Sequence, residues 1–424
     1  MSILIKKINL INFDSEKVCD IIINNGKIEK IGNNIKEEGF DEVINGEGKI
    51  AFPGLFDIHC HLRDPGYTYK EDIESGSKSA ARGGFTSVLA MPNTNPVADS
   101  KEVIEYINTR IKEKAVVKVY QAGAISKGLK SEELAEMGEM QKAGIIAVTD
   151  DGKPVRSGSL MKKALIYADM LGLPVISHAE DLDLVDDGYM NEGFMATYLG
   201  LRGINRAAEE SMTARDILIA KNTNTPVHIT HVSTKGSVDL VRHYKKLGVK
   251  VTCDTCPHYF SLTDKACDGF NTNAKMNPPL REDEDVKAII EGLKDGTIDM
   301  IGTDHAPHHR DEKECEFDKA LNGIIGFETA FNLAYKCLVK ENGMKLSEVI
   351  KLMSYNPNKF FKFDGGEIKE GADADLVIAS TGEKYIYKEE DIVSKSKNTP
   401  YIGYEFESKI EKVFVNGKEV LEEI

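Results

Sequence analysis

Two histidines separated by one residue, His59 and His61, end an apolar run that reads Gly-Leu-Phe-Asp-Ile-His-Cys-His-Leu-Arg. Successive side chains of a β-strand point to opposite faces, so both imidazoles can enter one cavity and bind one metal ion. The same pair can also simply pack, and the two histidines alone do not decide between these readings. Arg63 follows two residues later, and its planar guanidinium can grip a carboxylate with two hydrogen bonds.

Further aspartates and histidines end other apolar runs of the chain, at Asp150-Asp151, His178, His231 and Asp304-His305. Burying so many polar groups without a binding role would cost several kcal/mol. Imidazole and carboxylate are zinc ligands, and two histidine pairs with a bridging carboxylate suit two ions about 3.5–4 Å apart. Such ions activate water and polarise a carbonyl, which suits the opening or closing of an amide. Asp304 fits the general base of that reaction.

The elements that must position these residues are short apolar runs alternating with helix-like segments. Eight runs occur, at 54–61, 86–92, 117–123, 144–151, 174–178, 226–231, 250–254 and 299–305. Helix-like segments lie between most of them, including 131–142, 160–171 and 205–221. Strands alternating with helices indicate a parallel sheet, and eight such units predict an α/β protein with a (β/α)8 TIM-like barrel. The polar strand ends would then meet at one mouth.

The two ends of the chain differ from the middle and resemble each other. Both show alternating apolar residues with Asn-Gly pairs, at Asn25-Gly26, Asn45-Gly46 and Asn416-Gly417. Asn-Gly between such runs is a strong hairpin signal, because type I′ turns need a positive φ twice. We therefore predict a small β-sandwich domain built from residues 1–50 and 363–424, with the barrel spanning residues 51–362.

Composition excludes several classes of function. The net charge of −15 argues against nucleic acid and against anionic membranes as partners, and no apolar run approaches the roughly 18 residues of a membrane span. The N-terminus lacks a signal-peptide pattern, and an odd count of 7 cysteines suits a reducing compartment, so we expect a cytoplasmic protein. Cys253 and Cys256 are more consistent with packing than with metal binding, because i and i+3 on a strand face opposite ways.

The stretch from Ala306 to Asn322 is rich in charge and lacks clear periodicity. It directly follows the last strand of the predicted barrel. It can be a solvated loop or a mobile lid over the mouth of the barrel, and the sequence favours neither.

Three segments resemble the type I dihydroorotases of the amidohydrolase superfamily. They are Pro-Gly-Leu-Phe-Asp-Ile-His-Cys-His-Leu-Arg-Asp-Pro-Gly at 53–66, Gly-Thr-Asp-His-Ala-Pro-His at 302–308 and Glu-Gly-Ala-Asp-Ala-Asp-Leu-Val at 370–377. The resemblance covers nearly the whole chain. It implies a hydrolase acting on cyclic amides, which closes N-carbamoyl-L-aspartate reversibly to L-dihydroorotate and water in pyrimidine synthesis.

The resemblance also implies a role for each matching residue. His59 and His61 would bind one zinc ion, His178 and His231 a second, and Asp151 would bridge them. Asp304 would be the catalytic acid/base and would also touch the first metal. The substrate would be held by His61, Arg63, Asn93, Asn277 and His308, and by the backbone at Asn322 and Gly323.

Hydantoinases and allantoinases share the barrel and the four histidines, but they usually bridge the metals with a carboxylated lysine on the fourth strand. Here that strand ends in Asp150-Asp151, and Lys153 lies beyond it. The resemblance selects Asp151 as the bridge, with Asp150 as the competing candidate. A cyclic amidase of the hydantoinase or allantoinase type and a non-catalytic scaffold remain the alternatives. For partners the expectation is a small-molecule substrate, with self-association or association with aspartate transcarbamoylase.

Overall fold

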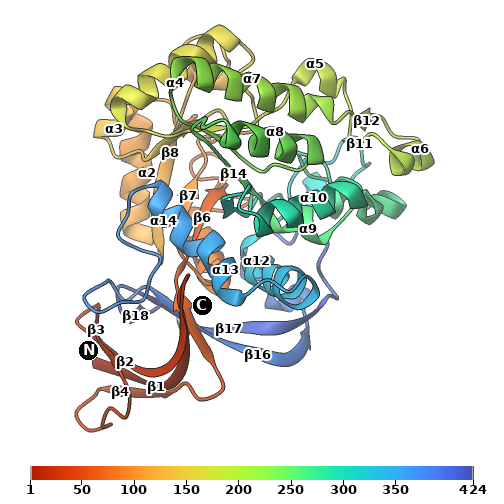
Figure 1. Cartoon of the computed structure of the whole chain (residues 1–424). Coiled ribbons are helices and arrows are strands. Elements are labelled where there is room, and N and C mark those ends of the chain that lie inside the picture. Colours follow the sequence, from red (N-terminus) through yellow and green to blue (C-terminus); the bar gives the residue numbers. More distant parts are fainter. Residues whose placement is uncertain (1, 423) are drawn as a thin grey trace.

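The structure is a computed structural model, and it describes residues 2–422 and 424. Its centre is a sheet of eight parallel strands in chain order, closed by a 2.9 Å hydrogen bond from the His61 amide to the His305 carbonyl (Figure 1). The predicted (β/α)8 barrel is therefore confirmed. Its strands are β6 (Leu55–Cys60), β7 (Phe85–Ala90), β8 (Lys118–Ala124), β9 (Ala147–Thr149), β10 (Val175–Ser177), β13 (Val227–Ile229), β14 (Val251–Thr255) and β15 (Met300–Ile301).

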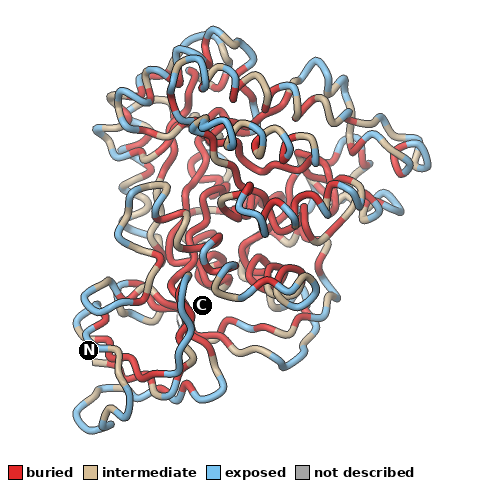
Figure 2. Tube along the Cα trace, viewed as in Figure 1, coloured by how far each residue is buried: buried red, intermediate tan, exposed pale blue. Residues whose placement is uncertain are grey.

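Helices surround this barrel, and the longer ones bury one face against it. In α10, for example, Ala288, Ile289 and Leu293 are buried at the three-to-four-residue spacing of a single helix face. The barrel strands are buried along almost their whole length, as Figure 2 shows. The connecting helices include α1 (Ile73–Arg82), α2 (Lys101–Lys114), α3 (Met137–Lys142), α4 (Gly158–Leu171), α7 (Ala207–Thr223), α8 (Lys235–Lys246), α10 (Asp283–Lys294), α12 (Phe327–Leu333), α13 (Leu346–Ile350) and α14 (Asn356–Phe360).

Two of the three predicted helices are found close to their expected bounds, as α4 and α7. The third, predicted from Ser131, begins only at Met137. Ser131 has a φ of +58°, and the Ala135 amide donates to the carbonyl of Ile125, the residue after β8, at 2.8 Å. This stretch is therefore hydrogen-bonded to the segment after β8 and does not form a helix. No helix in the described part of the chain has both the length and the apolar character needed to cross a bilayer.

The two ends of the chain join in one eight-stranded sheet, which lies below the barrel in Figure 1. Its order is β18-β17-β16-β5-β1-β2-β3, with β4 also paired to β1. Its own core is rich in isoleucine and includes Ile5, Ile21 and Phe414. The strands are β1 (Ser2–Ile11), β2 (Glu16–Asn24), β3 (Lys27–Gly32), β4 (Glu42–Asn45), β5 (Ile50–Pro53), β16 (Leu376–Ile386), β17 (Glu405–Val415) and β18 (Lys418–Glu419).

The Asn-Gly pairs behave differently from one another. Asn25-Gly26 joins β2 to β3 and Asn416-Gly417 joins β17 to β18, and all four residues have the positive φ that the predicted hairpin turns require. The hairpin predicted at Asn45-Gly46 is wrong, because β4 and β5 both pair in parallel with β1 instead of with each other. Here the Gly46 amide donates to the Lys6 carbonyl of β1 (2.8 Å).

Candidate metal and substrate site

The first group of predicted ligands meets where β6 and β9 end. The Nε2 atom of His59 lies 3.1 Å from Oδ1 of Asp151, and Nε2 of His61 lies 3.4 Å from the other carboxylate oxygen. Asp304 reaches the same place from the end of β15, with its Oδ1 atom 2.9 Å from Nε2 of His61. The donor atoms of His59, His61 and Asp151 all lie within 4.8 Å of one another, which is the spacing of a metal site.

A second group of predicted ligands shares Asp151 with the first. Nδ1 of His178, after β10, lies 2.7 Å from Nε2 of His231, after β13. These two nitrogen atoms lie 3.5 Å and 3.6 Å from Oδ1 of Asp151. Asp151 therefore stands between two histidine pairs, which is the position of a bridging ligand.

The charges of this cluster fit a bound cation. Nε2 of His59 and Oδ1 of Asp151 are buried and make no hydrogen bond in the described residues. Burial disfavours a charged imidazole, yet Asp151 and Asp304 outweigh it and raise the pKa of His59 to about 10. Two buried carboxylates thus demand positive charge, which one or more metal ions would supply through these same donors.

Asp150 and Asp151 have separate surroundings, although both follow β9. Oδ1 of Asp150 accepts hydrogen bonds from the amides of Ile125 (2.7 Å) and Ser126 (2.9 Å), and its other oxygen accepts from the Ser126 hydroxyl. This carboxylate therefore holds the loop after β8 and points away from the histidines. Only Asp151 lies among them.

Three of the predicted site residues have a strained backbone conformation. Arg63, His231 and Asp304 have φ values of +60°, +40° and +47°, a left-handed conformation that costs of order 1–3 kcal/mol in a residue other than glycine. Buried carboxylates below the site support two of these turns. Asp254 accepts from the His231 amide at 3.0 Å, and Asp57 accepts from the amide and hydroxyl of Thr303, each at 2.7 Å.

A cavity of about 200 Å³ opens above the ligands. Every predicted site residue except the more deeply buried His59 lies in its wall, namely His61, Arg63, Asn93, Asp151, His178, His231, Asn277, Asp304, His308, Asn322 and Gly323. Residues from seven loops of the barrel mouth are thus brought to one small space. Their roles in binding and catalysis stay predictions.

The Arg63 guanidinium brings a positive charge to one side of this cavity. The Arg63 Nε–H donates to the Pro307 carbonyl at 3.2 Å, and the rest of the guanidinium lies beside His308. Burial together with the charges of Arg63 and Lys70 lowers the pKa of His308 to about 2, so this imidazole is neutral. Oδ1 of Asn277 is buried without a hydrogen-bond partner in the described residues, so it can accept from a ligand.

The charged stretch from 306 to 322 packs onto the barrel beside the cavity and contains a short helix, α11 (Arg310–Lys313). Two buried lysines fix it. The Lys275 ammonium donates to the carbonyls of Phe317 (2.6 Å) and Ala320 (2.7 Å), and the Lys313 ammonium donates to Leu321 (2.7 Å) and Gly323 (3.1 Å). The ends of the stretch line the cavity, whereas its middle is anchored away from it.

Glu180 contacts a predicted metal ligand but was not predicted from the sequence. Its carboxylate lies 3.2 Å from Nε2 of His178, the ring nitrogen that faces away from Asp151. Such a contact orients an imidazole ligand and makes it a better donor. The signal was present, because residues two apart on an extended chain share a face, and Glu180 follows His178 by two.

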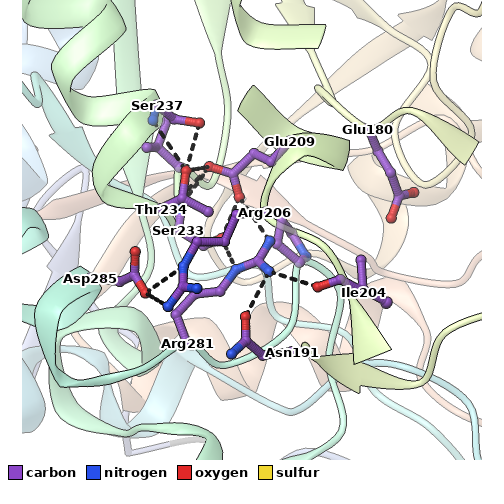
Figure 3. Close-up of polar contacts among 12 residues, drawn as sticks. Glu180, Asn191, Ile204, Arg206, Glu209, Ser233, Thr234, Ser237, Arg281 and Asp285 are labelled. Atoms are coloured by element: carbon purple, nitrogen blue, oxygen red, sulfur yellow. Dashed lines mark hydrogen bonds and ion pairs between the residues drawn. The ribbon is translucent and has the colours of Figure 1, made fainter. Parts of the chain in front are cut away.

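A buried ion pair of Arg281 with Glu209, also not predicted from the sequence, helps to join the loops that contain His231 and Asn277 (Figure 3). The guanidinium of Arg281 donates to Ser233 Oγ (3.1 Å) and Asn191 Oδ1 (3.0 Å) and lies 3.5 Å from Glu209. Glu209 in turn accepts from the amides of Ser233 (3.0 Å) and Thr234 (3.1 Å). These partners are up to 90 residues apart in the chain, so no local pattern could have found them.

Comparison with known proteins agrees with this geometry. Residues 48–237 match a family model described as dihydro-orotase-like. A protein of Acetivibrio thermocellus named dihydroorotase is 53% identical over 406 residues, which is 96% of this chain and 95% of that protein. One of Ruminiclostridium cellulolyticum with the same name is 52% identical and covers 99% of both chains.

Solved structures of similar fold include hydantoinases. The L-hydantoinase (dihydropyrimidinase) of Arthrobacter aurescens superposes with a TM-score of 0.90 at 24% identity, covering 99% of this chain and 95% of that one. The D-hydantoinase (dihydropyrimidinase) of a Thermus species has a TM-score of 0.84 at 25% identity, with 98% and 94% covered. These likenesses show the fold, while the identities near 50% over nearly the full length show the family: the chain belongs to the dihydroorotases of the amidohydrolase superfamily.

Proposed function

We propose that this protein is a dihydroorotase that interconverts N-carbamoyl-L-aspartate and L-dihydroorotate. In the hydrolytic direction the ring amide C–N bond breaks, water supplies OH to the carbonyl carbon, and its remaining proton goes to the leaving nitrogen. In the direction of synthesis the same bond forms and water is lost. The observation that carries this proposal is the meeting of a carboxylate–imidazole cluster with buried Arg63 and His308 in one 200 Å³ cavity.

We further propose that the resident metal is zinc, with two ions per chain. His59, His61 and Asp304 would hold the first, His178 and His231 the second, and Asp151 both. When bound, the ions would supply an activated water and a polarised amide carbonyl. Removal of metal by a chelator should stop turnover and lower the melting temperature, because a ligand that binds only the folded state stabilises it.

Asp304 is the residue that we propose as the proton carrier. Burial alone would raise the pKa of this carboxyl, but His59 and His61 outweigh it and hold the pKa below its usual range. The carboxylate is therefore charged at neutral pH and can accept a proton from water. Its place in the cavity wall, 2.9 Å from His61, lets it pass that proton to the leaving nitrogen.

Arg63 and His308 are the groups that we propose for the substrate carboxylate. A guanidinium can hold a carboxylate by two parallel hydrogen bonds, and Arg63 is the cation that this acidic protein brings into the cavity wall. Asn93 and Asn277 add neutral donors and acceptors beside it.

The test is turnover by zinc-loaded protein of L-dihydroorotate, N-carbamoyl-L-aspartate, dihydrouracil and hydantoin. We expect activity on the first two, because the last two lack the carboxylate that Arg63 would bind. Turnover of only dihydrouracil and hydantoin would show a cyclic amidase of another type. Metal analysis of the same preparation measures the number and kind of ions.

Self-association and a complex with aspartate transcarbamoylase both remain predictions. Mass measurement in solution, with and without that enzyme, addresses them.

A further inference from the structure

The segment between β16 and β17 leaves the terminal sheet and returns to the mouth of the barrel. Ser394, Ser396 and Asn398 are 1%, 5% and 4% exposed, whereas Lys395 between them is exposed. This alternation is that of an extended chain with one face buried. Ser394 donates to Glu71, and Ser396 donates to the Lys70 carbonyl (2.8 Å), so the segment lies along the loop that follows β6.

Asn398 lies at the barrel mouth, and its side-chain amide joins two parts of the loop that follows β15. Its Nδ2 donates to the carbonyls of Ala306 and Gly323, each at 3.0 Å, and its Oδ1 accepts from the His308 amide at 3.0 Å. Its own carbonyl accepts from the Ile325 amide at 3.0 Å. A side-chain amide provides two donors beside an acceptor, which is the set that these three backbone groups need.

The two parts of the loop that Asn398 joins belong to the cavity wall and are closely packed. Ala306, His308 and Gly323 all line the cavity. They approach so closely that a Cβ on Gly323 would lie 2.7 Å from that of Ala306, and Gly323 has a φ of +135° that only glycine adopts easily. The hydrogen bonds of Asn398 therefore fix backbone atoms directly behind the cavity wall.

We propose that Asn398 is a positioning residue for substrate binding, which it supports through the backbone of residues 306–308 and 323. The proposal rests on the dihydroorotase function proposed above. It adds to that site a residue from the segment that connects β16 to β17. Asn398 acts from behind the cavity wall and does not contact the metal-ligand cluster, so its effect falls on binding of the substrate and not on retention of metal.

Asn398→Asp is the sharpest variant, because it keeps the shape and the acceptor for His308. It replaces both donors by a carboxylate oxygen that faces two carbonyls. The Gly323 carbonyl keeps Lys313 as a donor, whereas the Ala306 carbonyl keeps none in the described residues. We expect KM for dihydroorotate to rise about tenfold or more, kcat to change by less than about threefold, and zinc content to stay that of the wild type.

Asn358→Asp is the matched control. Asn358 is also a buried asparagine whose Nδ2 donates to a carbonyl, that of Ser354 (2.9 Å), but it lies in α14 outside the cavity wall. If loss of stability alone changed the kinetics, both variants would share the change. Asn398→Gln, which keeps the amide, should recover part of the substrate affinity, and it replaces the aspartate variant if that one does not fold.

Amide hydrogen exchange provides a readout that does not need turnover. Asn398→Asp should speed exchange in segments 306–308 and 322–325, and the control should not. If the wild type failed to turn over dihydroorotate, the proposed function would fall while this measurement still tested the positioning role. The positioning role would be refuted if a folded Asn398→Asp protein kept both the wild-type exchange rates in those segments and the wild-type KM. An equal fall of kcat and zinc content would also refute it.

Discussion

Asp304 combines a strained backbone, a depressed pKa and a place in the cavity wall, and each has a different cause. The turn after β15 gives it a φ of +47°, and Asp57 holds the preceding Thr303 in place. The imidazoles of His59 and His61 keep its carboxyl charged. Strain retained at a residue that is also charged and in contact with the cavity is typical of a catalytic group.

Asp304→Asn should therefore lose turnover while keeping most of the metal. The amide is nearly the same size but accepts no proton, so we expect kcat to fall by about 10²–10⁴-fold, as for loss of a general base. Steady-state kinetics with zinc analysis measures both effects. Unchanged kcat would remove Asp304 from the proton transfer.

Arg63→Lys should weaken substrate binding even though the charge is kept. A lysine ammonium is a point charge that lacks the two parallel donors of a guanidinium, and the hydrogen bond from Nε to the Pro307 carbonyl would also be lost. We expect KM for dihydroorotate to rise by about tenfold, which corresponds to about 1.4 kcal/mol. Exposed Arg310→Lys, in the same region, serves as the control.

At the scale of elements, the chain's periodicity was enough to predict the eight strands and the polar residues at their ends. It could not separate Asp150 from Asp151, because both lie just beyond β9, where strand alternation no longer applies. It also missed the Arg281–Glu209 pair, because that contact depends on how α7 and the loop before α10 meet in space. The hairpin prediction at Asn45-Gly46 failed for a similar reason, because the pairing of β4 and β5 with β1 overrode the local preference for a turn.

The 306–322 stretch gives a prediction on pH. Burial lowers the pKa of Lys313 to about 7 from 10.5, so between these values the unfolded chain binds more protons than the folded one. The free energy of unfolding contributed by this group therefore rises as pH increases through that window, by at most about 1.4 kcal/mol per pH unit. Denaturant unfolding at several pH values should show this rise in the wild type and its loss in Lys313→Met. An equal dependence of the free energy of unfolding on pH in both proteins would contradict the prediction. Lys319→Met, at an exposed lysine, is the control.

At the scale of the whole molecule, β5 connects the terminal sheet to the barrel. Phe52 is fully buried in the barrel's core and stacks on Phe331 of α12 with ring centroids 4.8 Å apart, whereas the adjacent Ala51 belongs to the core of the sheet. Neighbouring residues of one strand thus belong to two cores, as alternation requires.

Phe52→Ala should accordingly destabilise both parts together. Removing a fully buried phenylalanine costs about 3–5 kcal/mol, and we expect one unfolding transition at lower temperature. Calorimetry measures it, with Val18→Ala on the exposed face of β2 as the control. Two separate transitions, of which only one shifted, would show that the sheet and the barrel unfold independently.

The pairing of β5 with β16 also sets an order of events during synthesis. Residues 50–53 emerge from the ribosome early, but their partners at 376–379 emerge only after every strand of the barrel. Asn398 follows later still. One edge of β5 therefore stays unpaired, and the cavity lacks the contacts of Asn398, until residues 376–398 have been synthesised. A ribosome-bound chain that ends before residue 376 would therefore carry all eight barrel strands without the strand that pairs with β5 and without Asn398.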